Sequence, residues 1–551
     1  MLRRDQVIDV LKREMSDSVL EISELRSATI VSVDPRSLPR VSIALVALGA
    51  RLRMMVASDE RPWRACFSLY YIYAFDREGT NIIIHAPLDP DRPTAPSIVD
   101  LVRAVDWYEL EARDLLGIEF EGRPPAPRFI LPDDWPEGVY PLRKDVSVEQ
   151  LRALYKPSPL EEARLLGAEE IVRIPIGPYH PALHEPEYFE LYVRGEKVVG
   201  ARYVGFMVHR GIEKLGESMK YDQVPFIAER ICGICGFVHS TSYCQAVEDA
   251  LGIEVPERAE FIRSLILEIE RVHSHLLWFG VALHLLGYDT GFMHVWRIRE
   301  RVMWLAELLT GSRKTYGLNV VGGVRRDIDR DRLDKARQVV KELRKEFAEL
   351  VKITIDVPQV RARLRGTGYL SPGEAQVFAV VGPTARGSGI DIDVRKDFPY
   401  AGYKRIRPRV AVYSEGDNLA RTLVRVDEVF ESLDLIERFI DEMPGGAIRA
   451  EKIEYEPYRI GIGSVEAPRG EVIHMVITGS RTPYRWRVRA PTYQNLIAVP
   501  TMLRGVDLAD APLTIASIDP CFSCTDRAIV INVATGASRS VSLREIVRRR
   551  R

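Results

Sequence analysis

The sequence contains few cysteines and no long apolar segment. Only six of its 551 residues are cysteine. Its longest mainly apolar runs, such as 41–50, are far shorter than the roughly 20 residues that a membrane-spanning helix needs. No apolar segment follows Arg3-Arg4, so we find no secretory or twin-arginine signal. We therefore expect a cytoplasmic chain that reaches a membrane only through other proteins.

Strong net charge and nucleotide-binding loops are also lacking. The formal net charge is −1, which gives no overall attraction to nucleic acid. A hydrophobic content of 46% and a charged content of 28% are those of an ordinary soluble globular protein. The glycine-rich stretch 382–389 lacks the Lys-Ser/Thr ending of a phosphate loop and does not fit a strand–GxGxxG–helix unit. We predict neither a nucleotide site nor a nucleic-acid partner.

The N-terminal part of the chain alternates between helical and strand-like patterns. Apolar spacing predicts a helix over 1–20 and another over 97–116, which Gly117 would end. Runs rich in β-branched and aromatic residues predict strands at 29–33, 41–46, 67–75 and 81–85. We expect a compact α/β domain that serves as a docking or scaffold module. Its boundary lies in the polar stretch 145–163, where Pro157 and Pro159 break regular structure.

Long helical patterns dominate the second part. A strand at 171–176 and a hairpin of 189–193 and 197–204 come first. The predicted helices then cover 256–286, 296–309, 327–355 and 417–443. Asp417 is the expected N-cap of the last of these. The fold class that follows is α+β, with an α/β N-terminal domain and a mainly helical second domain.

Two Cys-x-x-Cys pairs hold four of the six cysteines: Cys232 with Cys235, and Cys521 with Cys524. This spacing lets two sulfurs converge on one metal. The two pairs stand at opposite ends of the second part of the chain, separated by residues 236–520. We predict that they meet in space and hold a redox-active metal centre.

The spacing alone leaves other interpretations open. Four thiolates can close a structural zinc site, although zinc ribbons separate their pairs by roughly 15–20 residues. Disulfides are disfavoured in the cytosol, and a thioredoxin-like pair would need one Cys-x-x-Cys in a βαβ setting. Soft thiolates also suit iron and nickel.

Longer motifs carry a resemblance to two related families. The segment 106–145, from Asp106-Trp107-Tyr108-Glu109 to Tyr140-Pro141-Leu142-Arg143, resembles the signature of the 30-kDa subunit of respiratory complex I. Residues 170–527 resemble the large subunit of nickel–iron hydrogenases. The segments that match its two metal-binding motifs are Arg230-x-Cys232-Gly233-x-Cys235-x-x-x-His239 and Asp519-Pro520-Cys521-x-x-Cys524-x-x-Arg527. Further matching segments are Arg299-Glu300, Lys314-Thr315-Tyr316-Gly317-Leu318-Asn319, Glu466-Ala467-Pro468-Arg469-Gly470 and Tyr484-Arg485-Trp486-Arg487.

The combination is similar to the membrane-associated, complex-I-related hydrogenases, the branch that includes formate hydrogenlyase. It implies a complex I 30-kDa-like docking domain at 1–155, a hydrogenase and complex I 49-kDa-like catalytic domain at 156–527, and an extension at 528–551. The implied activity is reversible reduction of protons to H2. The alternative is a complex-I-like NADH/ferredoxin–quinone oxidoreductase module without hydrogenase activity. The complex I homologue has lost the metal-binding cysteines, so retention of all four favours a hydrogenase.

The resemblance implies a nickel–iron centre. Nickel would take four thiolates, with Cys235 and Cys524 bridging to iron and Cys232 and Cys521 binding nickel only. The iron would carry CO and cyanide ligands, and the family also allows a magnesium ion. Cys521 would be the thiolate that accepts a proton.

Further site residues follow from the same resemblance. Glu185, in the segment 180–186, matches the proton-relaying glutamate, and Arg469 matches the arginine over the open nickel–iron position. A solvated loop acid and a surface ion pair are the respective alternatives. His239 would orient a cysteine sulfur by a hydrogen bond. Two weaker matches are Asp519, as an anchor near that arginine, and Thr501, as a hydrogen-bond donor to cyanide.

Partners are implied as well. Cys66 and Cys244 are the only other cysteines, too few for an iron–sulfur cluster, so clusters are expected only in partner subunits. The expected partners are an iron–sulfur small subunit, a ferredoxin-like electron-transfer subunit and membrane antiporter-like subunits. A maturation protease would cut after Arg527 and remove 528–551. The expected location is the inner face of the cell membrane, as a peripheral subunit.

Overall fold

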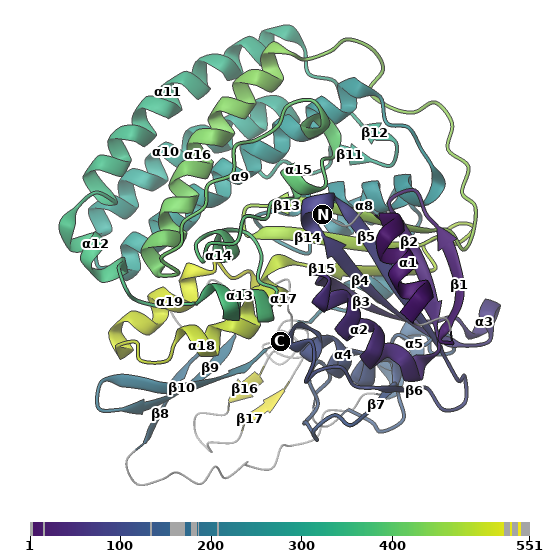
Figure 1. Ribbon diagram of the computed structural model, residues 1–551. Helices are drawn as coiled ribbons and strands as arrows, with labels where there is room; N and C mark the ends of the chain where they lie inside the picture. The colour runs from purple at the N-terminus through teal and green to yellow at the C-terminus, as the bar shows by residue number, and fades with distance from the viewer. Residues whose placement is uncertain are drawn as a thin grey trace. The chain divides into compact units, whose positions relative to one another are not determined.

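The computed structural model describes most of the chain and divides it into two compact units. The described residues are 4–14, 17–132, 135–154, 171–177, 185, 187–205, 209–522, 529–531 and 538–540. One unit contains residues 1–194, 202–214 and 525–551, and the other contains 195–201 and 215–524. Both helices and sheets are present, as expected of the α+β class (Figure 1).

A five-stranded sheet forms the centre of the first unit. Its strands lie in the order β1-β2-β5-β4-β3. They are β1 (Val19–Glu24), β2 (Ala28–Val33), β3 (Arg51–Asp59), β4 (Phe67–Phe75) and β5 (Thr80–Leu88). Strands β2 and β5 are parallel, and the other neighbours are antiparallel. Strand β4 is buried along its whole length, which explains its run of aromatic and aliphatic residues.

The expected strand at 41–46 is wrong, because this segment is helix α2 (Leu38–Ala47). The buried residues Leu38, Val41 and Leu45 recur at helical spacing, while Ile43 and Val46 are exposed. Since almost every residue here is apolar, that period cannot be seen in the sequence. The missed strand is β3, which follows directly.

The helix expected over 97–116 begins later than predicted. Helix α4 is Asp106–Leu116 and ends at Gly117, whose φ of 72° is the expected left-handed C-cap. Ser97 and Ile98 are instead tied to the Glu109 carboxylate, which accepts the Ser97 hydroxyl at 2.7 Å and the Ile98 N–H at 2.9 Å. The remaining elements before residue 215 are α1 (Arg4–Glu14), η1 (Pro35–Ser37), α3 (Arg61–Arg64), η2 (Asp76–Glu78), β6 (Thr94–Pro96), η3 (Arg103–Val105), β7 (Glu119–Glu121), α5 (Val148–Leu154), β8 (Val172–Ile176), β9 (Tyr188–Arg194), β10 (Lys197–Val204) and α6 (Ile212–Gly216).

Four long helices dominate the second unit. They are α9 (Glu257–Leu285), α10 (Asp289–Thr310), α11 (Arg330–Thr354) and α16 (Asn418–Asp441). All four were expected from the sequence, and Asp417 caps α16 by accepting the Ala420 N–H at 2.8 Å. Helix α9 packs against both α10 and α16 (Figure 1). It is buried along most of its length, which explains why its apolar residues cover most of its faces.

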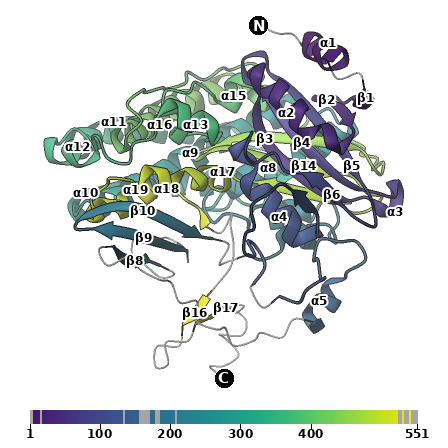
Figure 2. The same cartoon turned by 60° about the horizontal axis from the view of Figure 1, so that its bottom comes forward.

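Helix α8 (Gly236–Leu251) lies on a second, three-stranded sheet that the sequence patterns did not reveal (Figure 2). The sheet has the order β13-β14-β15, with β13 (Ile460–Ala467), β14 (Gly470–Ile477) and β15 (Arg485–Arg489) all antiparallel. Gly463 makes the close contact possible, because a Cβ there would stand 2.0 Å from the Ser242 carbonyl oxygen of α8. The sheet and helix α8 together position the candidate site.

The other elements of the second unit are short. They are α7 (Val224–Ala228), β11 (Asn319–Val320), β12 (Gly323–Val324), α12 (Pro358–Leu364), α13 (Pro372–Val377), α14 (Pro383–Arg386), α15 (Val394–Asp397), η4 (Ala401–Lys404), α17 (Pro491–Asn495), η5 (Leu496–Ala498), α18 (Val499–Met502), η6 (Leu508–Asp510) and α19 (Ala511–Ser517). Strands β16 (Ile529–Ile531) and β17 (Ser538–Ser540) pair near the C-terminus and belong to the first unit. Among the described residues, no helix combines the length and apolar character that crossing a bilayer requires.

Candidate metal centre

The two cysteine motifs meet in the second unit. Cys232 lies in the turn after α7, and Cys235 is the N-cap residue of α8. Cys521 follows α19. The Sγ atoms of Cys232 and Cys521 are 3.0 Å apart, although the two residues stand at opposite ends of the unit's sequence. One sulfur of each motif therefore meets the other in space, as the sequence predicted.

The described cysteines of the site are buried and interact with one another. Cys232 and Cys235 are fully buried and Cys521 is 4% exposed. The Cys232 sulfur accepts the Ile234 and Cys235 N–H groups at 3.4 and 3.3 Å. The pKa of the Cys235 thiol is raised well above its ordinary value by its hydrogen bond to Cys232, by burial, and by the charges of Cys232 and Cys521. The site thus gathers soft donors away from water.

The set of ligands is incomplete in the described part of the chain. Cys524, the expected fourth ligand, lies outside the described residues. Within those residues, no group of three or more His, Cys, Asp or Glu has the arrangement that would hold one metal ion. The donor chemistry nevertheless fits nickel and iron, since buried sulfurs from both motifs meet at one place.

Arg469 is a buried cation beside these sulfurs. It lies in the turn between β13 and β14, and its side chain is 4% exposed. Its Nε donates to the Asp519 carbonyl oxygen at 2.7 Å, and its Nη2 donates to Asp519 Oδ1 at 3.0 Å. Burial opposes its charge, but Asp519 and the charges of the three cysteines raise the pKa of Arg469 well above its usual range. The alternative of a surface ion pair is excluded by this burial.

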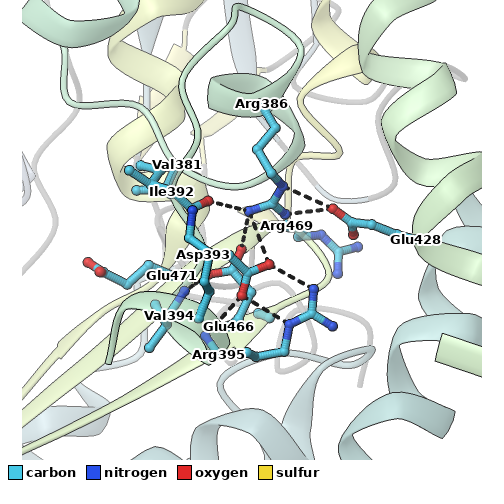
Figure 3. A network of polar contacts seen from close by, with 12 residues as sticks. Val381, Arg386, Ile392, Asp393, Val394, Arg395, Glu428, Glu466, Arg469 and Glu471 are labelled. Carbon is cyan, nitrogen blue, oxygen red and sulfur yellow. Dashed lines mark hydrogen bonds and ion pairs between the residues drawn. The ribbon is translucent and has the colours of Figure 1, made fainter. Parts of the chain in front are cut away.

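A network of buried charges holds the hairpin that carries Arg469 (Figure 3). Arg386 donates to Glu428 Oε1 at 2.6 Å and to Glu466 Oε1 at 2.9 Å. Arg271 of α9 donates to the carbonyl oxygens of Glu466 and Ala467, at 2.7 and 3.1 Å. Buried ion pairs are costly to break because one charge then remains without its partner. The network therefore fixes the β13–β14 turn, and Arg469 with it.

The second motif is fixed by its own backbone contacts. Asp519 has a φ of 54°, an uncommon conformation for a residue with a Cβ, and it turns the chain into Cys521. The Cys521 N–H donates to Thr492 Oγ1 at 3.0 Å. Thr492, in α17, was not predicted from the sequence. The only local feature that could have drawn attention to Thr492 is its position after a proline in Ala490-Pro491-Thr492.

The first motif is held by residues of α9 and of the loop 315–317, which the sequence analysis also missed as site residues. The Glu270 carboxylate accepts the Phe237 and Val238 N–H groups, both at 3.0 Å, at the start of α8. It also accepts the Thr315 hydroxyl at 2.7 Å. Burial raises the pKa of Glu270 to about 8, against the lowering effect of these hydrogen bonds. The Tyr316 hydroxyl donates to the Cys232 carbonyl oxygen at 2.8 Å.

His239 lies one helical turn after Cys235 on α8 and is fully buried. Its Nδ1 is 3.1 Å from Nε2 of His474, a residue of β14. His239 was expected at the site from the resemblance to the first metal-binding motif. The sequence carried no signal for His474.

The remaining predicted residues are not gathered at the cysteines by any described contact. Glu185 is half-buried and belongs to the first unit, so its distance from the cysteines is not defined. Thr501 is half-buried in α18, whereas the threonine in contact with Cys521 is Thr492. His180, His184 and Arg527 lie outside the described residues. The roles expected of Glu185 and Thr501 stay predictions.

Comparison with protein families finds matches over residues 31–151 and 210–527. The family described as "Respiratory-chain NADH dehydrogenase, 30 Kd subunit" matches residues 31–151. The family described as "Respiratory-chain NADH dehydrogenase, 49 Kd subunit" matches 286–461 and 456–527. The family described as "Nickel-dependent hydrogenase" matches 210–299, the segment that contains the first cysteine motif.

Individual relatives decide between a hydrogenase subunit and a complex I subunit. The chain is 43% identical to formate hydrogenlyase subunit 5 of Escherichia coli (strain K12), over 91% of this chain and 89% of that protein. It is 41% identical to the membrane-bound hydrogenase subunit alpha of Pyrococcus furiosus, over 65% of this chain and 88% of that protein. The chain belongs to the complex-I-related nickel–iron hydrogenase large subunits. This hydrogenase subunit is an oxidoreductase, as the retention of all four cysteines favoured.

More distant relatives show how widely the architecture is used. A protein of the NADH-quinone oxidoreductase of Phocaeicola vulgatus is 32% identical, over 78% of this chain and 86% of that protein. A chain in the solved structure of the membrane-bound sulfane sulfur reductase, an archaeal respiratory membrane complex, is 33% identical with a TM-score of 0.63. That match covers 65% of this hydrogenase subunit and 99% of the other chain. Function must therefore be argued from the cysteine site and not from the fold.

Proposed function

We propose that this hydrogenase subunit reduces protons to H2, reversibly, at a nickel–iron centre held by Cys232, Cys235, Cys521 and Cys524. The observation that carries the proposal is the buried contact between the sulfurs of Cys232 and Cys521, 3.0 Å apart. Because each sulfur belongs to a Cys-x-x-Cys, the contact brings two pairs of potential ligands to one place. Thiolates are soft donors that suit nickel and iron.

The bound metals would supply the two-electron chemistry of H2, and the chain's own residues would supply ligands, a fixed cation and a proton path. Cys521 is proposed to accept and release the proton at its sulfur. Its backbone is held by Thr492, so the sulfur returns to one position after each transfer. The Cys232, Cys235 and Cys521 side chains are buried, which keeps bulk water away from the sulfur that takes the proton.

Arg469 is proposed to stabilise negative charge that develops at the reacting position. Its guanidinium is already held by Asp519 and by the Ser274 hydroxyl, to which Nη1 donates at 3.2 Å. A cation oriented in advance costs no reorganisation when charge develops, and inside a buried site its field is weakly screened. Glu185 is proposed to relay the proton onward, a role that requires it to come within hydrogen-bond reach of the thiolate.

Electrons are proposed to come from an iron–sulfur small subunit. Cys66 and Cys244 are the only cysteines outside the two motifs, and about four are needed for a cluster. A ferredoxin-like subunit, membrane antiporter-like subunits and a maturation protease are the further partners that we propose. Formate hydrogenlyase subunit 5 is the relative that supports assembly in a formate-hydrogenlyase-type complex. Peripheral attachment to the inner face of the cell membrane follows from such an assembly.

Several details of the centre and its maturation belong to the same proposal. CO and cyanide would be ligands of the iron, His239, Asp519 and Thr501 would line the centre, and a magnesium ion is allowed. Residues 1–155 are proposed as the docking domain and 156–527 as a mainly helical catalytic domain. Cleavage after Arg527 would remove 528–551 once nickel is bound, and the intact mass of the mature chain tests this directly.

The function is tested on the complex purified with its native partners. We expect about one nickel per chain and H2-dependent reduction of a dye, both lost in a Cys232→Ser variant because a hydroxyl is a poor nickel ligand. Cys66→Ser is the matched control, since Cys66 lies in the first unit and should leave nickel and activity unchanged. A mature complex that contains no nickel, or a Cys232→Ser variant with unchanged activity, would refute the proposal.

A further inference from the structure

Three buried side chains form a hydrogen-bonded chain that ends at the first cysteine motif. Trp486 Nε1 donates to His474 Nδ1 at 3.2 Å, and His474 Nε2 lies 3.1 Å from His239 Nδ1. All three side chains are fully buried. His239 follows Cys235 by one turn of α8, so both lie on the same side of that helix.

The register of the sheet explains why these side chains meet. His474 of β14 is paired with Val488 of β15, and Trp486 is two residues earlier on the same strand. Side chains two residues apart share a face, so Trp486 and His474 are diagonal neighbours. On the other side, His474 is paired with Gly463 of β13. The missing side chain of Gly463 lets α8 approach, and the Ser242 hydroxyl donates to the Gly463 carbonyl oxygen at 2.8 Å.

The chemistry of the indole fixes the direction of every hydrogen bond in the chain. Because an indole N–H can only donate, Nδ1 of His474 must be an acceptor. The single hydrogen of a neutral His474 is therefore on Nε2, which donates to Nδ1 of His239. Nδ1 of His239 is then the acceptor, so the hydrogen of a neutral His239 is on Nε2.

Neither histidine can be charged while this chain is intact. In a doubly protonated His474, the Nδ1–H would face the indole N–H. In a doubly protonated His239, the Nδ1–H would face the Nε2–H of His474. In both cases two donors would meet and no hydrogen bond could form. Burial also lowers the pKa of His474 well below its usual value. The arrangement thus selects one tautomer for each ring.

We propose that Trp486 and His474 are positioning residues that hold His239 as the neutral tautomer with its hydrogen on Nε2. Imidazole suits nickel and iron, and it binds a metal through a nitrogen that carries a lone pair. In this tautomer Nε2 carries a hydrogen, and the lone pair of Nδ1 is occupied by His474. His239 is thereby kept from becoming a metal ligand one turn after Cys235 and is left as an N–H donor. This consequence for the metal rests on the proposed function, whereas the tautomer itself does not.

The tautomer is tested by nitrogen NMR on the full-length chain labelled with 15N-histidine, with His239→Gln to assign the signal. We expect wild-type His239 to show a protonated Nε2 and an unprotonated Nδ1 from pH 5 to pH 8. Trp486→Phe removes the donor, and we expect the His239 signals to shift toward a mixture of tautomers. Trp278→Phe is the matched control, because it removes an indole hydrogen bond to the Ala516 carbonyl oxygen on a different helix.

Two variants of His474 distinguish an effect of its hydrogen bonds on the His239 tautomer from an effect of its packing. In His474→Gln the amide can accept from Trp486 and donate to His239, so we expect the wild-type tautomer to be restored. In His474→Phe neither bond is possible, and the tautomer should be lost. A His239 that carries its hydrogen on Nδ1 in the wild type, or that keeps the Nε2 hydrogen in His474→Phe, would overturn the proposal.

The consequence for the metal has its own readout in the nickel-loaded complex. We expect no ligand-strength 15N coupling in the nickel electron paramagnetic resonance spectrum of the wild type, and its appearance in His474→Phe. Directly bound nitrogen in the wild type would overturn that consequence. A wild-type complex without nickel would refute the proposed function, while the NMR result for the tautomer would stand.

Discussion

Arg469 holds Asp519 at two points, through its backbone oxygen at 2.7 Å and its carboxylate at 3.0 Å. Asp519 stands two residues before Cys521. A turn of one hairpin and the cysteine motif near the C-terminus are thereby joined by a planar, two-point contact. Such a contact fixes orientation as well as distance, which a lysine cannot do.

This relationship predicts the effect of Arg469→Lys. The ammonium keeps the charge but cannot make both contacts with Asp519, so we expect H2-dependent dye reduction to fall by about 100-fold or more, the order found when an oriented stabilising donor is removed. Nickel content should stay near that of the wild type. The control is Arg405→Lys, because Arg405 forms an exposed ion pair with Glu257. Activity of Arg469→Lys equal to that of the control would contradict the role given to Arg469.

Glu270→Gln tests the support of the first motif. One oxygen of Glu270 would be replaced by an NH2 group that faces a backbone N–H, which costs about 1–3 kcal/mol. We expect a lower thermal midpoint of the purified chain and faster hydrogen exchange at Phe237 and Val238, the two amides that Glu270 accepts. Glu260→Gln on the same helix is the control, since Glu260 pairs with the exposed Lys404. Unchanged exchange at both amides would show that Glu270 does not hold the motif.

Burial of the Glu270 carboxyl makes its contribution to folding stability depend on pH. The pKa of Glu270 is raised to about 8 in the folded chain from an ordinary value of 4.5. Between these values the folded state binds more protons than the unfolded state, so this group's contribution to stability decreases as pH rises from about 4.5 to about 8. Glutamine does not titrate. We therefore expect the difference in thermal midpoint between wild type and Glu270→Gln to narrow as pH rises across this window, and a widening difference would contradict the assignment.

Thr315→Gly removes both the backbone strain at residue 315 and the hydrogen bond from its hydroxyl to Glu270. Thr315 has a φ of 61°, which is costly for a β-branched residue by about 1–2 kcal/mol. Its hydroxyl bond to Glu270 offsets that cost by about 0.5–1.5 kcal/mol. Glycine removes both, so we expect little change in thermal midpoint but faster exchange at Phe237 and Val238. The control is Thr310→Gly at the end of α10, which should lower the midpoint because glycine destabilises a helix.

The sequence predicted the parts of the fold that have clear periods or caps. The four long helices, the left-handed Gly117 and the Asp417 cap all follow from local chemistry. The helix over 38–47 could not be recognised, because its exposed face is as apolar as its buried face. The sheet of β13–β15 was missed because its strands are buried on both faces and lack an alternating pattern.

The same limit applies to the site. Cys232 and Cys521 were recognisable because ligand spacing is a local property of the sequence, and His239 was expected only from the resemblance to the hydrogenase motif. Glu270, Thr492 and His474 act on the cysteine motifs from distant positions, and a glutamate or a histidine within a helix or strand carries no mark of its partner. Only the packing of α9, α17 and β14 against the motifs identifies them.

The central claim is that both cysteine motifs bind one nickel, and X-ray absorption at the nickel edge of the mature complex tests it most directly. We predict about four sulfur neighbours of nickel in the wild type, the number that two Cys-x-x-Cys pairs supply. One sulfur should be lost in Cys521→Ser, or nickel should be lost altogether. A nickel with mainly nitrogen and oxygen neighbours, or a site filled by zinc alone, would contradict the account.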